Sequence, residues 1–289
     1  GQQLERNNNL PAATELYASA SLPPNRERHV RTLFKQQLFE QALARCNQLT
    51  GQPLCADEEM FCQSFTPRIQ RKLGGPAVRR LTKQFNREQL ILADDEQRVE
   101  LQVITHYQTL GYDGIWCENE LFNALFGLLF WHQIFAPLEG AFSHPYQQAP
   151  LDFNSPAFSQ RRHPLFQARL HQLQNVNLPE EIVDQYSEHR GIANPFINWK
   201  RCAPDHIALL CQRIPQHKLL MIMEKICFDP QAYRSGFPDL FLWHADSNDY
   251  LLVEVKGPGD QLQNSQKRWL HLFDSMGIQY RISWVFRPT

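Results

Sequence analysis

The sequence predicts an α/β (α+β) protein, with a helical N-terminal region and a C-terminal unit built on a small mixed sheet flanked by helices. Helical patterns fill positions 3–64. Near the C-terminal end we expect two strands joined by a turn, at about 238–244 and 250–257, then a helix at about 261–276 and a strand at about 279–286. An apolar fraction of 43% is ample for a buried core, and a length of 289 residues suggests two domains, which we expect at 1–92 and 93–289.

The N-terminal helices contain a weak internal repeat. Positions 12–18 and 39–45 are both rich in small residues, and a proline pair at 23–24 separates them. Their spacing of roughly 30 residues is near the period of tetratricopeptide-type helical pairs. An ordinary helical bundle is the alternative. Beyond this region we expect helices at about 96–110, 117–135, 164–176, 179–188, 204–213 and 217–228, with prolines marking an irregular segment between 136 and 156.

Composition points to an intracellular protein that does not enter membranes. Nothing resembles a signal peptide, and no apolar run reaches the roughly 20 residues that span a bilayer. The seven cysteines form no CxxC pattern, which fits reduced thiols. We therefore expect a cytoplasmic, nucleoid-associated protein in a bacterium or a nuclear one in a eukaryote. The first residue is Gly1 and not Met, as in a fragment of a longer chain.

Charge is distributed unevenly along the chain. Residues 1–92 hold 13 Lys and Arg against 8 Asp and Glu, while the remainder holds 16 against 22. A stretch without any acid carries seven basic residues: Arg68, Arg71, Lys72, Arg79, Arg80, Lys83 and Arg87. A basic part that attracts phosphates and an acidic part that collects carboxylates for a metal suit a nucleic-acid enzyme. A solvated helix face is the alternative for the basic stretch.

Three charged residues near the C-terminal end carry the strongest chemical signal. Asp239 directly follows a proline, and Glu254 and Lys256 lie about fifteen residues further on, two positions apart. Side chains at i and i+2 of a strand share a face, and a hairpin through the polar turn at 245–249 would bring Asp239 beside them. Two carboxylates and an amine at one point can hold Mg²⁺ or Mn²⁺ and prepare a water molecule for attack. A salt-bridged hairpin is the alternative, but charge in an apolar strand is costly unless it is paired or bound.

This arrangement resembles the PD-(D/E)xK nucleases, and the longer string around it resembles the VRR-NUC subclass and the Fanconi-associated nuclease family. The residues that carry the resemblance are Pro238-Asp239, Val253-Glu254-Val255-Lys256-Gly257-Pro258-Gly259-Asp260, Gln266 and Trp269, with further agreement at 114–118, 127–131 and 161–170. The resemblance implies a restriction-endonuclease-like core, with a VRR-NUC part at about 190–289 and an upstream catalytic helix at about 117–135. It also implies that the Val255 carbonyl is a metal ligand and that Gln266 supports the site.

Two glutamates, Glu118 and Glu120, are candidates for the upstream acid that such nucleases usually add. With helical spacing Glu118 shares a face with Phe122 and Leu125, whereas Glu120 lines up with Asn123. An acid at the start of the apolar helix face that packs on the core can point at a buried metal site. The family pattern Gly-Ile-x-x-Glu also selects Glu118, and Glu120 is the alternative candidate.

The resemblance implies a metal-dependent DNA nuclease with 5′ flap endonuclease and 5′-to-3′ exonuclease activity in interstrand crosslink repair, acting on branched or flap DNA. Arg161 and Arg162 are further candidates for DNA contact. Two other functions are open: a sequence-recognising, restriction-type nuclease with the same core, and a non-catalytic DNA-binding scaffold.

Overall fold

The computed structural model describes residues 1–76, 84–93, 96–144 and 146–288. The chain divides into two compact units, Gly1–Lys83 and Gln84–Thr289. The boundary expected at residue 92 therefore lies too late, because Arg87–Ile91 forms a strand (β1) that pairs with the last strand of the second unit. No helix among the described residues combines the length and apolar character that crossing a membrane requires.

The N-terminal unit is helical over its described residues, as predicted. Its helices are α1 (Gln2–Arg6), α2 (Leu10–Ala18), α3 (Asn25–Lys35), α4 (Phe39–Gly51) and α5 (Ala56–Lys72). From α2 to α5, each helix packs against the next one in the chain. Side chains from α3, α4 and α5 form the core, which contains Val30, Leu33, Ala42, Cys46, Leu49, Phe61, Cys62, Phe65 and Ile69. The likeness to tetratricopeptide repeats stays a prediction.

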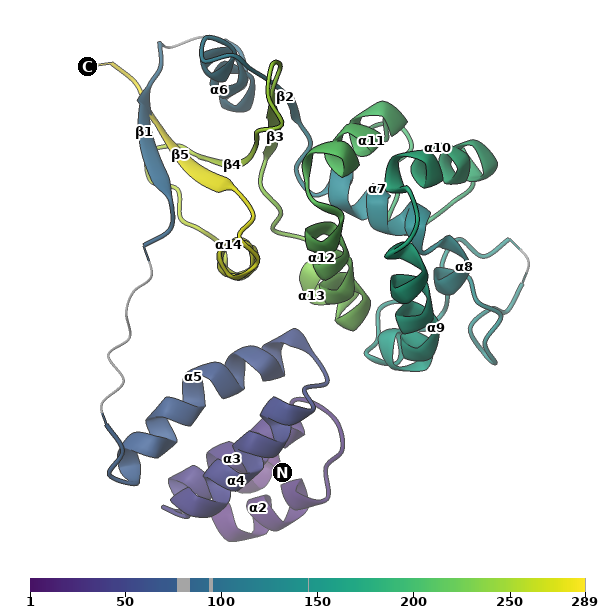
Figure 1. The fold of residues 1–289 in the computed structure, drawn as a ribbon. Helices are drawn as coiled ribbons and strands as arrows, with labels where there is room; N and C mark the ends of the chain where they lie inside the picture. Colours follow the sequence, from purple (N-terminus) through teal and green to yellow (C-terminus); the bar gives the residue numbers. More distant parts are fainter. Residues whose placement is uncertain (77–83, 94–95, 145, 289) are drawn as a thin grey trace. The chain divides into compact units, whose positions relative to one another are not determined.

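A five-stranded mixed sheet organises the second unit (Figure 1). Its strand order is β1-β5-β4-β3-β2. The strands β2 (Tyr112–Trp116), β3 (Leu240–His244) and β4 (Tyr250–Lys256) pair antiparallel, whereas β5 (Tyr280–Phe286) lies parallel to both β4 and β1. The hairpin and the final strand expected near the C-terminal end are thus confirmed. Strands β1 and β2 are not among the elements predicted from the sequence.

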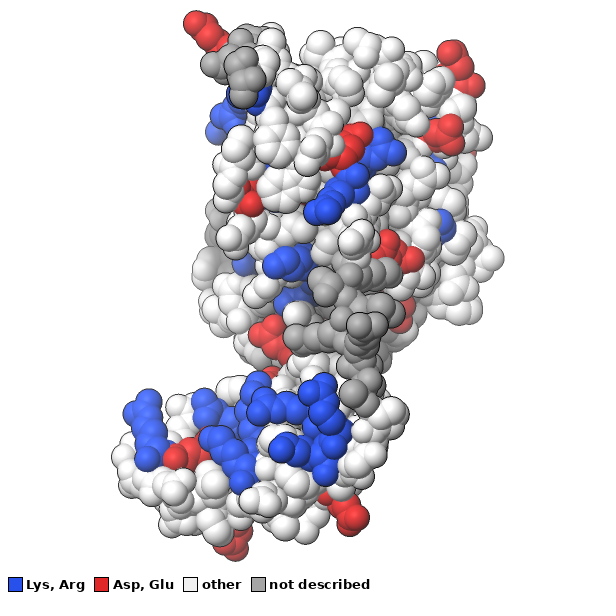
Figure 2. Space-filling view, turned by 90° about the vertical axis from the view of Figure 1, so that its left-hand side faces the viewer, with Lys and Arg blue, Asp and Glu red and all other residues white. Residues whose placement is uncertain are grey.

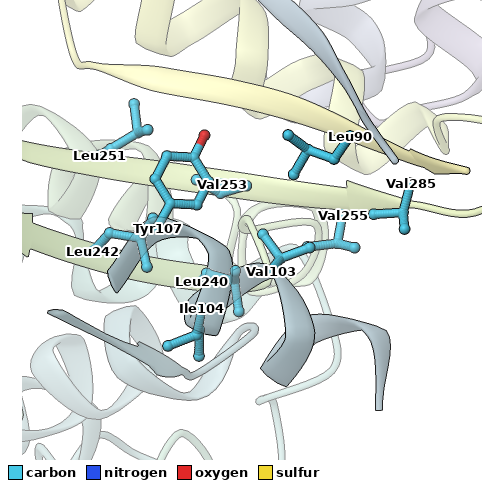
Figure 3. Close-up of a cluster of buried hydrophobic side chains, with 10 residues drawn as sticks. All are labelled: Leu90, Val103, Ile104, Tyr107, Leu240, Leu242, Leu251, Val253, Val255 and Val285. Carbon is cyan, nitrogen blue, oxygen red and sulfur yellow. The ribbon is translucent and has the colours of Figure 1, made fainter. Parts of the chain in front are cut away.

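Helices cover the central strand β4 on both faces, which is why all of its residues are buried. On one face, α6 (Val99–Gln108) packs its Val103, Ile104 and Tyr107 against Val253 and Val255 (Figure 3). Helix α14 (Asn264–Met276) lies on the other face. The alternation along β4 therefore directs its two valines to α6, and Glu254 and Lys256 to the side of α14.

A large helical insertion separates β2 from β3, although these two strands are neighbours in the sheet. It consists of α7 (Glu120–Leu129), α8 (Trp131–Ile134), α9 (Ala157–Leu173), α10 (Leu178–His189), α11 (Pro204–Arg213), α12 (Gln216–Phe228) and α13 (Pro230–Tyr233). Phenylalanine rings fill its interior, with Phe126 against Phe130 at 4.8 Å and against Phe196 at 4.7 Å between centroids. The single helix expected at 117–135 is wrong: it starts only at Glu120, and Phe130 interrupts it.

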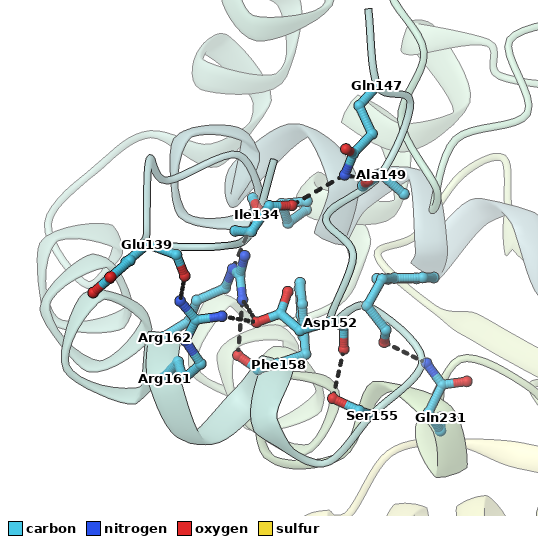
Figure 4. A network of polar contacts seen from close by, with 12 residues as sticks. Ile134, Glu139, Gln147, Ala149, Asp152, Ser155, Phe158, Arg161, Arg162 and Gln231 are labelled. Atoms are coloured by element: carbon cyan, nitrogen blue, oxygen red, sulfur yellow. Dashed lines mark hydrogen bonds and ion pairs between the residues drawn. The ribbon is translucent and has the colours of Figure 1, made fainter. Parts of the chain in front are cut away.

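A buried arginine fixes the irregular segment of this insertion (Figure 4). Arg162 is fully buried and pairs with Asp152 at 2.9 Å, while its Nε donates to the carbonyl of Ile134 at 3.2 Å. Arg161 pairs with the same carboxylate at 2.9 Å and also donates to the carbonyl of Glu139. The expectation that Arg162 contacts DNA is therefore wrong, because its guanidinium group is buried and paired with Asp152 inside the protein.

One glycine holds the segment before β3 against the start of α14. Gly236 has a φ of +89°, and a Cβ atom there would lie 2.5 Å from the carbonyl carbon of Ser265 and 2.7 Å from the backbone nitrogen of Gln266. Only glycine accepts both that backbone conformation and that approach.

We expect Gly236→Ala to destabilise the protein more than Gly259→Ala does. Both glycines have a positive φ, so both substitutions carry conformational strain of about 1–2 kcal/mol. A Cβ atom at Gly259 would meet nothing within 4 Å, whereas overlap with α14 adds roughly 1–3 kcal/mol at Gly236. Urea unfolding of both variants measures the difference, and equal losses would show that α14 shifts freely.

Candidate active site

Asp239 joins three segments of the second unit. Its carboxylate accepts a hydrogen bond from the backbone N–H of Val255 at 2.8 Å. Its carbonyl oxygen accepts from the N–H groups of Cys117 at 2.9 Å and Glu118 at 3.0 Å. The preceding Phe237 is buried and stacks on both neighbouring elements, with centroids 4.4 Å from Phe122 and 4.2 Å from Trp269. The hairpin thus brings Asp239 beside β4, as the sequence predicts.

Glu254 and Lys256 form a buried ion pair on the α14 side of β4. Their exposed fractions are 1% and 8%, and Lys256 Nζ lies 2.7 Å from Glu254 Oε1. Gln266 donates from Nε2 to the same oxygen at 2.6 Å, while its own Oε1 accepts from the N–H of Gln263 at 2.8 Å in a capping box. Gln266 is therefore fixed by the first turn of α14, and in turn it orients the Glu254 carboxylate.

The two upstream glutamates have different surroundings. Glu120, the first residue of α7, pairs with Arg201 at 2.6 Å and accepts from Asn198 at 3.0 Å. Glu118 precedes that helix in a turn with a φ of +43°, and its charge acts on both Asp239 and Glu254. The prediction that Glu118 lies on a helix face is therefore wrong, because the helix starts only at Glu120. The turn after β2 instead brings the Glu118 backbone N–H to the Asp239 carbonyl at 3.0 Å, and a role for its carboxylate at the site stays a prediction.

Burial and mutual repulsion shift the pKa values of Asp239 and Glu254. Burial raises the pKa of Asp239 to about 6, and the bond from the Val255 N–H only partly opposes this. Burial also raises the pKa of Glu254 to about 8, and the neighbouring Asp239 carboxylate adds to the effect despite Lys256. Oxygen donors with excess negative charge in a buried site are what Mg²⁺ or Mn²⁺ binds, so the residues fit a hard divalent cation. Val255 contributes its N–H to Asp239, and a ligand role for its carbonyl stays a prediction.

An aromatic and basic group that the sequence does not predict lies at the end of β2. The Arg98 and Arg201 guanidinium groups lie over the Trp116 ring, 4.7 and 4.6 Å from its centroid. Trp116, Glu120 and Arg201 also line a hollow of about 40 Å³. Guanidinium groups bind oxyanions, and here Arg201 is also paired with the Glu120 carboxylate. Arg98 and Arg201 are far apart in the sequence, and only the fold brings both guanidinium groups to the Trp116 ring.

The basic residues predicted to contact DNA are dispersed. Arg68, Arg71 and Lys72 are exposed on α5 in the N-terminal unit, and Arg87 is exposed on β1 in the second unit. Arg79, Arg80 and Lys83 lie outside the described residues. The basic stretch is thus divided between the two units, contrary to its assignment to one helical region.

Comparisons with known proteins agree on one family. Residues 174–286 match the VRR-NUC domain model. A Fanconi-associated nuclease 1 homolog of Pseudomonas aeruginosa is 35% identical over 272 residues, which are 93% of this chain and 49% of that protein. The Fanconi-associated nuclease 1 of Danio rerio is 36% identical over 193 residues, 65% of this chain and 20% of that protein. The chain thus spans half the length of these relatives or less.

A solved structure resembles the whole chain. It is a crystal structure of paFAN1 bound to DNA with a 2-nucleotide 5′ flap and a gap, with a TM-score of 0.74 and 33% sequence identity. The match covers 100% of this chain and 53% of that one. The matched VRR-NUC segment begins before the position of about 190 expected from the sequence, and the sheet also takes β1 and β2 from outside it.

We expect the metal-free protein to lose stability relative to Glu254→Gln as the pH rises from about 6.5 to 8.5. The folded-state pKa of about 8 lies above the ordinary 4.5, so the folded protein binds this proton more tightly than the unfolded chain does. That contribution is full below pH 4.5 and is lost as the pH rises through 8, whereas glutamine has no proton to lose. The gap in free energy of unfolding, measured by urea titration with chelator present, should change by on the order of 2 kcal/mol in favour of the variant. Parallel pH curves would contradict this.

Proposed function

Because the chain carries a VRR-NUC domain and is homologous to the Fanconi-associated nucleases, we propose that it is a metal-dependent, structure-specific DNA nuclease. Its substrates are branched and 5′-flap DNA, which it cuts endonucleolytically and degrades from 5′ to 3′ during repair of interstrand crosslinks. It acts in the bacterial cytoplasm or the eukaryotic nucleus, where this DNA is found. The observation that carries the proposal is the buried pair of Glu254 and Lys256 near the end of β4, with the half-buried Asp239 bonded to the same strand.

The carboxylates of Asp239, Glu254 and Glu118, with the Val255 carbonyl, are the groups that hold the cofactor. A bound Mg²⁺ or Mn²⁺ supplies positive charge to the phosphate and lowers the pKa of a coordinated water. The buried setting strengthens such charge interactions, because little water competes for them.

Lys256 acts on the attacking water. Its ammonium group is held 2.7 Å from Glu254 and has further hydrogen atoms to donate. It orients the water and stabilises the charge that grows on the phosphate oxygens. The water oxygen then bonds to phosphorus as one P–O ester bond breaks; one water proton is released to solvent or stays on the new phosphate monoester, and the other ends on the leaving oxygen, which becomes a hydroxyl. Gln266 keeps the Glu254 carboxylate in place during this step.

A matched pair of glutamates tests this assignment. Glu118→Gln, Asp239→Asn and Lys256→Met should each slow cleavage of a labelled 5′ flap by roughly 10²–10³-fold or more in Mn²⁺. Glu120→Gln should stay within about tenfold of the parent, since that carboxylate is already paired with Arg201. Chelator should abolish cleavage by the parent. Single-turnover rates on flap, splayed and plain duplex DNA provide the measurement.

Three outcomes would contradict the proposal. Undiminished flap cleavage by Asp239→Asn and Lys256→Met would remove the catalytic assignment. Cleavage that depends on base sequence and ignores branching would identify a restriction-type nuclease. Binding of DNA without any cleavage in Mn²⁺ would identify a scaffold.

We further propose that the N-terminal unit binds the DNA backbone through a basic face on α3 and α5. Arg31 and Arg68 both lie over the Phe65 ring, 5.5 Å from its centroid, so they belong to one surface. Arg71 and Lys72 continue it to the end of α5. Figure 2 displays lysine and arginine side chains gathered on one face of this unit. Such a face contacts phosphates and reads no sequence.

We expect the triple variant Arg68→Gln, Arg71→Gln, Lys72→Gln to bind flap and duplex DNA more weakly to a similar degree. Each lost phosphate contact should reduce the slope of log affinity against log salt by about 0.9, so the triple variant should lose up to roughly 3. Fluorescence anisotropy across a KCl series measures the slope. Arg190→Gln, an exposed arginine at the end of α10, is the control. An unchanged slope in the triple variant would exclude this face from DNA binding.

A further inference from the structure

Two histidines and a glutamate come together in the helical insertion, apart from the candidate active site. His132 lies on α8, and Glu188 and His189 end α10. One potential ligand atom from each residue lies within 4.8 Å of the other two. Helix α7, about 15 Å long, separates the turn that holds Glu118 from α8.

His189 is the fixed member of this cluster. Its exposed fraction is 6%, and its ring stacks on Trp131 with centroids 4.1 Å apart and planes 13° apart. Its Nε2 atom is buried, yet it has no hydrogen-bond partner within the described parts of the chain. A buried ring nitrogen without a partner is costly, by roughly 1–3 kcal/mol.

An ordinary ion pair does not explain this nitrogen. Glu188 Oε2 lies 4.0 Å from His189 Nε2, which is too far for a hydrogen bond. His132 approaches edge-on, with ring centroids 5.7 Å apart and planes at 78°, so its own nitrogen faces the same space. The exposed His132 and Glu188 side chains can turn, whereas Trp131 holds the His189 ring.

We propose that His132, Glu188 and His189 bind a Zn²⁺ ion. Two imidazoles and one carboxylate suit zinc, and a water molecule completes a tetrahedral shell. Bonds of about 2.0–2.1 Å put neighbouring ligand atoms about 3.3 Å apart, so rotation of the two exposed side chains closes the present spacing. Mg²⁺ prefers an all-oxygen shell, so this site and the carboxylate site select different metals.

The ion would fasten α8 to the C-terminal end of α10. These short segments are joined otherwise by the stacking of Trp131 on His189, and Trp199 lies 6.5 Å from Trp131 between ring centroids. The role is structural, since the cluster is remote from Asp239 and Glu254. The inference does not depend on the nuclease proposal.

Zinc retention in excess Mg²⁺ tests the site, because Mg²⁺ saturates the catalytic carboxylates and leaves the histidines free. The metal-free parent is dialysed against Zn²⁺ and Mg²⁺, and bound zinc is measured by mass spectrometry and by competition with a chromophoric chelator. We expect one zinc per chain and a higher melting temperature with zinc. His132→Ala and Glu188→Gln, both at exposed positions that folding tolerates, should each weaken binding roughly tenfold or more.

Two controls separate this site from others. His163→Ala, an exposed histidine on α9, should bind zinc like the parent, and so should Asp239→Asn. The proposal is overturned if the parent retains no zinc, or if His132→Ala and Glu188→Gln bind it as tightly as the parent does. Loss of zinc in Asp239→Asn alone would assign the ion to the catalytic carboxylates and also overturn it.

Discussion

The bonds around Asp239 are the constraint on which the rest of the candidate site depends. One residue uses its carboxylate to hold β4 through the Val255 N–H, and its carbonyl to hold the turn of Cys117 and Glu118. The segment before β3, strand β4 and the turn after β2 are therefore held together at Asp239. Packing of Phe237 between Phe122 and Trp269 secures the same residue from behind. Gln266, fixed by its own capping box on α14, then orients the Glu254 carboxylate separately.

Burial gives the site its chemical character at a cost in stability. The β4 strand is covered on both faces, so Glu254 and Lys256 lie where charge is poorly solvated. Lys256 and Gln266 compensate one oxygen of Glu254. The raised pKa values of Asp239 and Glu254 show that the compensation is incomplete without a further positive charge. A cation at this site would offset the same desolvation and charge repulsion that raise the two pKa values.

Structural features that neighbouring residues determine are predictable from the sequence. The hairpin after Asp239 and the alternation of Glu254 and Lys256 follow from adjacent residues, and the structure reproduces both. Features that depend on a distant part of the chain are not predictable in this way. Strand β1 has no alternating pattern and is a strand only because it pairs with β5, almost two hundred positions later. The helix face that favours Glu118 over Glu120 does not exist, since the Glu118 backbone is left-handed, and only the family pattern Gly-Ile-x-x-Glu still selects Glu118. Arg162 looked like a surface charge because nothing near it in sequence reveals Asp152 as its partner.

The insertion between β2 and β3 has a consequence for how the chain acquires its chemistry. These strands are hydrogen-bonded neighbours, yet more than a hundred residues separate Trp116 from its partner Leu240. Closing so long a loop is entropically costly until the intervening helices are compact. On the ribosome, Glu118 emerges well before Asp239 and Glu254 exist. The acids therefore cannot converge until nearly the whole second unit has been synthesised, so the candidate site is assembled only at the end of that process.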